Sequence, residues 1–185
     1  VEVGMITEQE FEEVRRRESY FSKGLRVGYL WPFSSMGGAE RLLVLDFAYQ
    51  YDTRDFFLSG RSGLRWGGDL DEDHGRAVDV VLLDAKIGRY FNGGDFSPFV
   101  SAGIGIHWVK AEERIEVERG RFEENEDSGT GLALIAGGGF TAFKTYNFQF
   151  QLDIDYFIIL EKLDVGGYPK GIIFTFCIRK GQKRD

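Results

Sequence analysis

The chain has little cysteine, no excess of positive charge and no long apolar run. Cys177 is the only cysteine among 185 residues, which excludes a disulfide within the chain. The net charge of −7 argues against nucleic acid as a partner. No stretch of about 18 consecutive apolar residues is present, which excludes a transmembrane helix. A membrane-spanning β-barrel stays open, because its strands only alternate in hydrophobicity.

Glycine and aromatic residues, in contrast, are abundant. The chain contains 25 Gly, 17 Phe, 8 Tyr and 3 Trp, but only 3 Pro. Glycine allows close approach and bending in strands, and aromatic residues favour strands. Together with alternating apolar and polar positions, this composition predicts one all-β domain with tight curvature.

The first residues differ from this pattern. The segment TEQEFEEVRRR (7–17) predicts a short helix, with Thr7 as N-cap and Glu10 at the capping-box position. Its acidic residues come first and its arginines last, as the helix dipole favours. We therefore expect an N-terminal segment at 1–19, a β domain at 20–180 and a basic tail at 181–185.

Eight strands are predicted in the β domain. Their spans are 20–32, 41–51, 55–66, 78–91, 97–110, 131–143, 147–160 and 170–179. Long and short connections alternate between them, and the longest is a charged stretch from Ala111 to Thr130. Within it RIEVERGRFE (114–123) alternates around Gly120 like a protruding hairpin. Bacterial outer-membrane barrels have short turns at one end and long loops at the other. We therefore expect an antiparallel up-and-down transmembrane barrel whose two chain termini lie on the side of the short turns.

Each predicted strand has an apolar face and a mostly polar face. In FQFQLDIDYFII (148–159), apolar residues alternate with Gln149, Gln151, Asp153 and Asp155. The fourth strand has an apolar face made of Val81, Leu83, Ala85 and Ile87. A soluble barrel turns its polar face to water, whereas a membrane barrel turns it inward.

Glycines on the polar face indicate that this face points inward. On a solvent face they would weaken the strands, whereas Gly103, Gly105, Gly137 and Gly139 would leave room for long side chains inside a narrow barrel. The candidate charges balance, as buried charges must. The predicted interior polar network comprises Arg26, Asp46, Arg61, Arg65, Asp84, Lys86, His107, Gln149, Gln151, Asp153 and Asp155. Such an interior is filled, so no open pore is expected.

Aromatic residues gather at the two ends of the apolar face. Trp31, Trp66 and Trp108 lie at the long-loop end of odd-numbered strands and predict an interfacial girdle. A second girdle is predicted at the short-turn end from Tyr20, Tyr49, Tyr51, Phe56, Phe91 and Phe148.

Two segments resemble strands of a known superfamily. SPFVSAGIGIHW (97–108) and GLALIAGGGFTAF (131–143) are similar to consecutive strands of the small eight-stranded outer-membrane barrels of the OmpA/OmpX type. The resemblance covers residues 20–180 and implies a location in the bacterial outer membrane, periplasmic N- and C-termini, and contact with outer-membrane lipid and lipopolysaccharide. Such barrels often finish on an aromatic residue, whereas this chain continues through CIRKGQKRD.

Some barrels of this superfamily are lipid A deacylases or acyltransferases. The deacylases need a Ser nucleophile beside a His base, and the matching region QLDIDYFII contains neither. In DLDEDHG (69–75) the aspartates are spaced as in a calcium loop, but Gly75 falls one place late and Val80 stands where Glu is needed. We therefore expect a solvated acidic loop there and no catalytic, metal or cofactor site.

The sequence favours a non-enzymatic role for the barrel. We expect a structural or interaction scaffold, or an accessory subunit of an envelope complex, with 111–130 as the surface for a protein partner. Two alternatives stay open. One is a lipid A-modifying enzyme, which needs a nucleophile and a base. The other is a soluble lipocalin-like binder, which needs an apolar interior.

Overall fold

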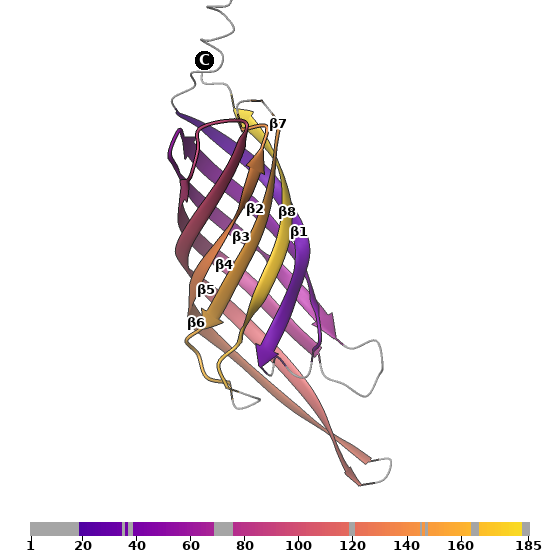
Figure 1. Cartoon of the computed structure of the whole chain (residues 1–185). Helices are drawn as coiled ribbons and strands as arrows, with labels where there is room; N and C mark the ends of the chain where they lie inside the picture. Colours follow the sequence, from indigo (N-terminus) through magenta and orange to yellow (C-terminus); the bar gives the residue numbers. More distant parts are fainter. Residues whose placement is uncertain are drawn as a thin grey trace, which may run out of the picture.

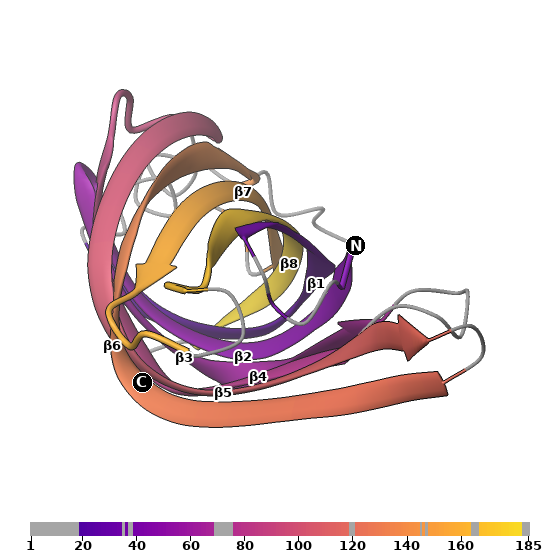
Figure 2. The same cartoon turned by 90° about the horizontal axis from the view of Figure 1, so that it is seen from below.

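The structure, a computed structural model, is an eight-stranded closed antiparallel barrel in which each strand pairs with the next and β8 pairs with β1. The strands are β1 (Ser19–Ser34), β2 (Leu42–Thr53), β3 (Phe56–Gly68), β4 (Arg76–Tyr90), β5 (Phe96–Glu118), β6 (Arg121–Ala142), β7 (Phe148–Ile159) and β8 (Lys170–Gln182). Figures 1 and 2 show the barrel from the side and along its axis. The predicted all-β, eight-stranded, antiparallel barrel is confirmed.

The structure describes residues 19–34, 36, 39–68, 76–118, 121–144, 146, 148–163 and 167–182. The predicted helix at 7–17 and the acidic loop at 69–75 lie outside these residues. Among the described residues, no helix is long and apolar enough to cross a membrane.

The connections between strands are sorted between the two ends of the barrel. Residues 54–55, 91–95 and 143–147 connect strands at one end, which we call the short-turn end. Residues 35–41, 69–75 and 160–169 connect strands at the other end, the long-loop end. The alternation predicted from the sequence holds for these six connections.

The β5–β6 hairpin departs from this sorting. The two strands stay paired as far as Glu118 and Arg121, so the connection is only residues 119–120. The stretch 111–130 is therefore mostly strand, as its alternation around Gly120 indicated, and it is not a long loop. Figure 1 shows this hairpin running well past the other strands at the long-loop end.

The apolar face of the strands is the outer surface of the barrel. On β5, Ile104 is 56% exposed, whereas the inward-facing Arg61 of β3 is 2% exposed. The same alternation continues along β2, β7 and β8, where inward residues are buried and outward residues are apolar and exposed. The predicted orientation of the polar face is the one found.

The fourth strand contains a β-bulge at Leu82. Val81 and Leu83 pair with consecutive residues of β5, so Leu82 between them has no partner there. Because of this extra residue, Leu82 and Leu83 both point outward, while Val81 and Asp79 point inward. The prediction that Val81 shares the outer face with Leu83 is wrong, because regular alternation does not continue through a bulge.

Deleting Leu82 should leave the barrel interior intact. The residues on either side of it already pair with consecutive residues of β5, so without Leu82 the strand alternates regularly and Asp79 still points toward Arg65 and His107. Deleting Ile87, which lies in a regular part of the same strand, should instead turn over the residues on one side of the gap. Separating a buried charge from its partner costs about 3–5 kcal/mol, so the Ile87 deletion should clearly lower the thermal unfolding midpoint by circular dichroism, whereas the Leu82 deletion should stay close to the wild type. Equally large losses for the two deletions would contradict the assignment of Leu82 as the extra residue of a bulge.

Candidate functional site

The barrel interior is divided into layers, and the layer at the long-loop end is apolar. Connection residues contribute to it together with inward residues of the strands. Its members are Leu30, Met36, Ala39, Leu42, Val44, Ala77, Val109, Ala111, Ala133, Ile135, Phe157, Ile159, Leu163 and Ile173, all buried. This apolar layer was not predicted from the sequence, because Phe157 and Ile159 continue the face of β7 that is otherwise polar.

Next to the apolar layer, on the side of the short-turn end, lies a network of buried charges, which we call the central network. Its members are Arg26, Asp46, Arg61, Arg65, Asp79, Asp84, Lys86, His107, Asp153 and Asp155. Asp155 of β7 accepts a hydrogen bond of 2.9 Å from Arg61 of β3 and one of 2.7 Å from Lys86 of β4. These bonds run between strands on opposite sides of the barrel, so the network crosses the interior.

The same network continues through the other carboxylates. Arg61 Nε lies 2.5 Å from Asp84 Oδ2, and Arg65 Nη1 lies 2.8 Å from Asp79 Oδ2. Arg26 is 3.4 Å from Asp153. All these side chains are at most 5% exposed, so the pairs are desolvated and each loss of a partner is costly.

His107 bridges two carboxylates within the network. Its Nδ1 lies 2.9 Å from Asp79 Oδ1, and its Nε2 lies 2.8 Å from Asp84 Oδ1. The ring stacks on Phe157 of the apolar layer, with 6.3 Å between ring centroids. His107 therefore lies at the boundary between the charged and apolar layers.

A second polar cluster closes the short-turn end. Arg179 Nη1 donates to Asp52 Oδ2 at 3.1 Å, and the Tyr90 hydroxyl donates to Asp52 Oδ1 at 2.5 Å. The Tyr90 ring also packs with Phe57 and Phe99, with centroids 5.3 and 6.0 Å away. The interior is thus capped by packed side chains at this end as well.

Lys144 lies in the turn after β6 and covers this cluster. Its Nζ is 3.5 Å from the centre of the Tyr90 ring and donates to the Arg54 carbonyl at 2.7 Å. Burial lowers the pKa of Lys144 to about 8, although Asp52 and Asp55 oppose that shift. The turn residue therefore takes part in closing the barrel.

Glycines stand opposite several of the charged inward side chains. Gly105 pairs with Asp84 and Gly103 with Lys86 across the β4–β5 ladder, and Gly137 pairs with Asp155 across β6–β7. A Cβ atom at Gly103 would lie 2.7 Å from Lys86 Cγ, and at Gly105 and Gly137 it would collide with the facing carboxylate. Each of these glycines makes room for the charged neighbour on the next strand.

The structure places every residue of the predicted interior network inside the barrel, but not all of them meet. Gln149 donates to the Lys144 carbonyl and lies at the short-turn end, while Gln151 hydrogen-bonds to Asp153. Asp46 is fully buried and neither of its oxygens has a hydrogen-bond partner. Four buried charges among the described residues were not predicted from the sequence: Asp79, hidden by the bulge, Asp52 and Arg179, at strand ends, and Lys144, in a turn.

The predicted aromatic positions are found on the outer face with one exception. Trp31 and Trp66 are each 38% exposed, and Trp108 is partly exposed, all toward the long-loop end. Tyr20 was predicted for the second girdle, but it faces inward and its hydroxyl donates to the Lys144 carbonyl at 2.9 Å. Phe21, the next residue, takes the outer position and is 55% exposed.

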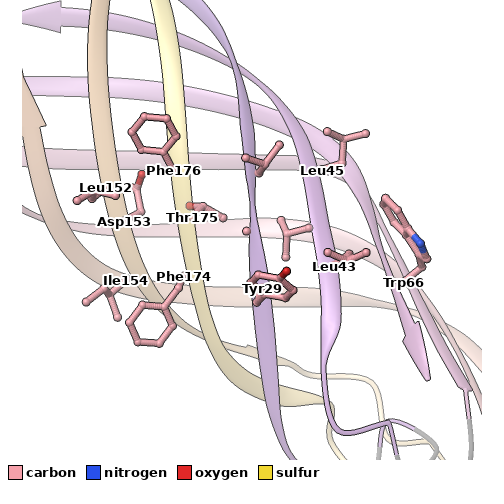
Figure 3. A pocket seen from close by; sticks show the side chains of 13 residues that line it. Tyr29, Leu43, Leu45, Trp66, Leu152, Asp153, Ile154, Phe174, Thr175 and Phe176 are labelled. Carbon is pink, nitrogen blue, oxygen red and sulfur yellow. The ribbon is translucent and has the colours of Figure 1, made fainter. Parts of the chain in front are cut away.

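A shallow groove of about 620 Å³ crosses the outer face of β7, β8, β1 and β2 and reaches Trp66 on β3. Two rows of outward side chains form its walls, and Figure 3 shows Leu152, Phe176 and Leu45 in one row and Ile154, Phe174, Tyr29 and Leu43 in the other. Between the rows the side chains point inward, so backbone forms the floor. The groove is an apolar feature of the outer surface.

The described residues offer no arrangement for hydrolysis or metal binding around His107. Both of its ring nitrogens already contact carboxylates, so neither is positioned beside a hydroxyl or thiol. Among the described residues no group of His, Cys, Asp and Glu side chains is arranged to hold a metal ion. Cys177 is buried inside the barrel.

The fold is similar to those of small outer-membrane proteins. Neisserial surface protein A is 12% identical with a TM-score of 0.63, over 87% of this chain and 96% of that one. Ail of Yersinia pestis, solved with the heparin analogue sucrose octasulfate, is 17% identical with a TM-score of 0.45, over 87% and 97% of the two chains. The N-terminal barrel of Pseudomonas aeruginosa OprF is 20% identical with a TM-score of 0.40, over 86% and 97%.

The sequence itself matches no protein-family model and no curated protein. The likeness to Neisserial surface protein A therefore concerns the fold. At that level, the resemblance to the small eight-stranded outer-membrane barrels is confirmed.

Gly105→Ala should destabilise the barrel, because its Cβ atom would collide with the Asp84 carboxylate. Overpacking of this kind costs about 1–3 kcal/mol, which should appear as a lower midpoint in denaturant unfolding followed by tryptophan fluorescence. Gly60→Ala is the matched control, since the nearest atom to its Cβ is the Asp84 carbonyl oxygen at 3.9 Å. If both variants unfold at the same midpoint, the space opposite the carboxylate is not limiting.

Proposed function

We propose that the chain is a bacterial outer-membrane barrel with a sealed interior, which acts as an anchored scaffold and displays the β5–β6 hairpin to a protein partner. The observation that carries this proposal is the inverted distribution of polarity. The outer face is apolar all round, while the interior contains paired charges. A soluble barrel has the opposite arrangement, and a membrane barrel requires this one.

The membrane location is supported by the size of the exposed apolar surface. Exposed large hydrophobic residues occur on all eight strands, including Phe47 at 60% and Ile87 at 56%. Soluble monomers rarely expose apolar patches of more than a few hundred Å². Trp31, Trp66 and Trp108 then form the interfacial girdle at the long-loop end.

The orientation follows from the same comparison with membrane barrels. Short turns lie on the periplasmic side and longer loops outside. Ser19 pairs with Thr53, and Phe21 with Gln182, so the described ends of β1 and β8 are both at the short-turn end. We therefore place both chain termini in the periplasm and the hairpin on the cell surface.

Outer-membrane lipid and lipopolysaccharide are the proposed non-protein partners. The groove on the outer face is walled by residues such as Tyr29, Leu43 and Phe174, which offer an apolar channel for a hydrocarbon chain. This role needs no chemistry from the interior, in keeping with a barrel that has no expected cofactor.

A sealed interior favours a scaffold over a pore. The apolar layer, the central network and the cluster around Tyr90 follow one another along the axis and fill the barrel with side chains. The two alternatives are less well supported. A lipid A-modifying enzyme needs a free base, whereas both ring nitrogens of His107 contact Asp79 and Asp84. A lipocalin-like binder needs an apolar cavity in the barrel interior, whereas the central network fills that space with charged side chains.

The hairpin is the proposed partner surface because of its charge and its free edge. Residues 111–130 include eight acidic and three basic side chains. Pairing of β6 with β7 begins only at Ala133, so no described strand pairs with 121–131 on that side. An unpaired acidic edge suits an extended, positively charged segment that adds a strand.

An arginine in the middle of the outer face should test the membrane location. Ile104→Arg should lower the free energy of unfolding in lipid vesicles by about 2–4 kcal/mol, because the charge would lie in hydrocarbon. Asn125→Arg, on the exposed part of the hairpin, should unfold like the wild type. Equal stability of the two variants, or full solubility of the wild type without detergent, would contradict the proposal.

The hairpin can be shortened without disturbing the barrel. Replacing residues 112–126 by Asn-Gly removes seven acidic and three basic residues and joins Ala111 to Asp127, which are already paired, through a two-residue turn. The detergent-solubilised wild type should bind an oligolysine peptide in a salt-dependent manner, and the shortened form should bind it at least about tenfold more weakly, a change of about 1.4 kcal/mol. Calorimetry measures both, with an oligoglutamate peptide as control. Unchanged affinity for oligolysine would contradict the proposal that the hairpin is the interaction surface.

A further inference from the structure

The surroundings of His107 fix the number of its protons. A carboxylate oxygen only accepts hydrogen bonds, and both ring nitrogens lie within 2.9 Å of one, Nδ1 of Asp79 Oδ1 and Nε2 of Asp84 Oδ1. A neutral imidazole has a single N–H, so its second nitrogen would point a lone pair at a carboxylate. Only the doubly protonated ring donates to both partners.

The other groups around the ring do not replace that proton. From β3, Arg65 contacts Asp79 at 2.8 Å and Asp84 at 3.7 Å, and Arg61 contacts Asp84 at 2.5 Å. From β7, Phe157 stacks on the ring, while Asp155 is engaged by Arg61 and Lys86. From β6, the residue paired with His107 is Gly131, which carries no charge.

The charge balance of the central network gives an independent reason for the same conclusion. The network contains the carboxylates of Asp46, Asp79, Asp84, Asp153 and Asp155. Against these five, the network has only four other basic side chains, Arg26, Arg61, Arg65 and Lys86. One carboxylate would remain uncompensated in a water-poor interior, which is costly. A protonated His107 is the fifth cation.

We propose that His107 is a proton-binding site inside the sealed barrel, where an imidazolium held between Asp79 and Asp84 completes the charge balance of the central network. This inference goes beyond the scaffold role and does not depend on the hairpin. The proton is a structural component of the interior, comparable to a bound cation. Its stabilisation is fully present while His107 is protonated and is lost as the pH rises and the proton is released.

The protonation state can be observed directly. The chain has two histidines, so His74→Gln leaves His107 as the only one. In that variant, labelled with ¹⁵N-histidine and folded in detergent micelles, both ring nitrogens should give imidazolium shifts at neutral pH. A wide separation of the two shifts, the mark of a neutral tautomer, would overturn the proposal.

The charge balance predicts that neutralising Asp46 shifts the thermal unfolding midpoint in opposite directions with and without His107. Asp46 has no hydrogen-bond partner, so Asp46→Asn removes a charge without breaking a hydrogen bond. In the wild type this substitution should lower the thermal unfolding midpoint, because it leaves the network with excess positive charge. In a His107→Gln background it should raise the midpoint, because it restores neutrality.

The outcome separates charge balance from local packing. If Asp46→Asn shifts the midpoint in the same direction in both backgrounds, His107 does not act as the fifth cation and the proposal fails. If His107→Gln does not fold alone, recovery of folded barrel in the double variant still supports the proposal, and failure of both leaves the ¹⁵N measurement to decide it.

Discussion

The narrow interior of a closed eight-stranded barrel is the constraint on which the rest of this structure depends. Eight strands leave a space that inward side chains just fill, so a large side chain needs a small neighbour. Glycine is that neighbour here: Gly105 stands beside Asp84, Gly103 beside Lys86 and Gly137 beside Asp155. These three glycines are therefore a requirement of the charged side chains inside the barrel and not of turns.

The same narrow interior requires every charge of the central network to be compensated. With little room for water, an unpaired charge is not hydrated and must be matched by a nearby opposite charge. The apolar layer on one side and the cluster of Phe57, Tyr90 and Phe99 on the other reinforce this requirement by separating the charges from both ends. A titratable residue such as His107 is then held in one protonation state by its neighbours.

Which residues of each strand point inward was largely predictable from the sequence, because a buried polar face and an exposed apolar face produce a clear alternation. Arg26, Arg61 and Lys86 were placed inside on that basis. Asp79 was missed because the bulge at Leu82 reverses the alternation before it, and nothing in the local sequence marks a bulge. The apolar layer was missed because inward and outward residues are both apolar near the long-loop end, so alternation carries no information there.

The bonds of Asp155 connect residues far apart in the chain, to Arg61 across 94 positions and to Lys86 across 69. None of these contacts can form within a single hairpin, and they need β3, β4 and β7 to be curled around the same axis. Until then Asp155 is better hydrated than paired. Closure of the ring and the pairing of Asp155 are therefore one event, so a partly closed sheet lacks the part of the network that crosses the barrel, and folding should be slow and cooperative.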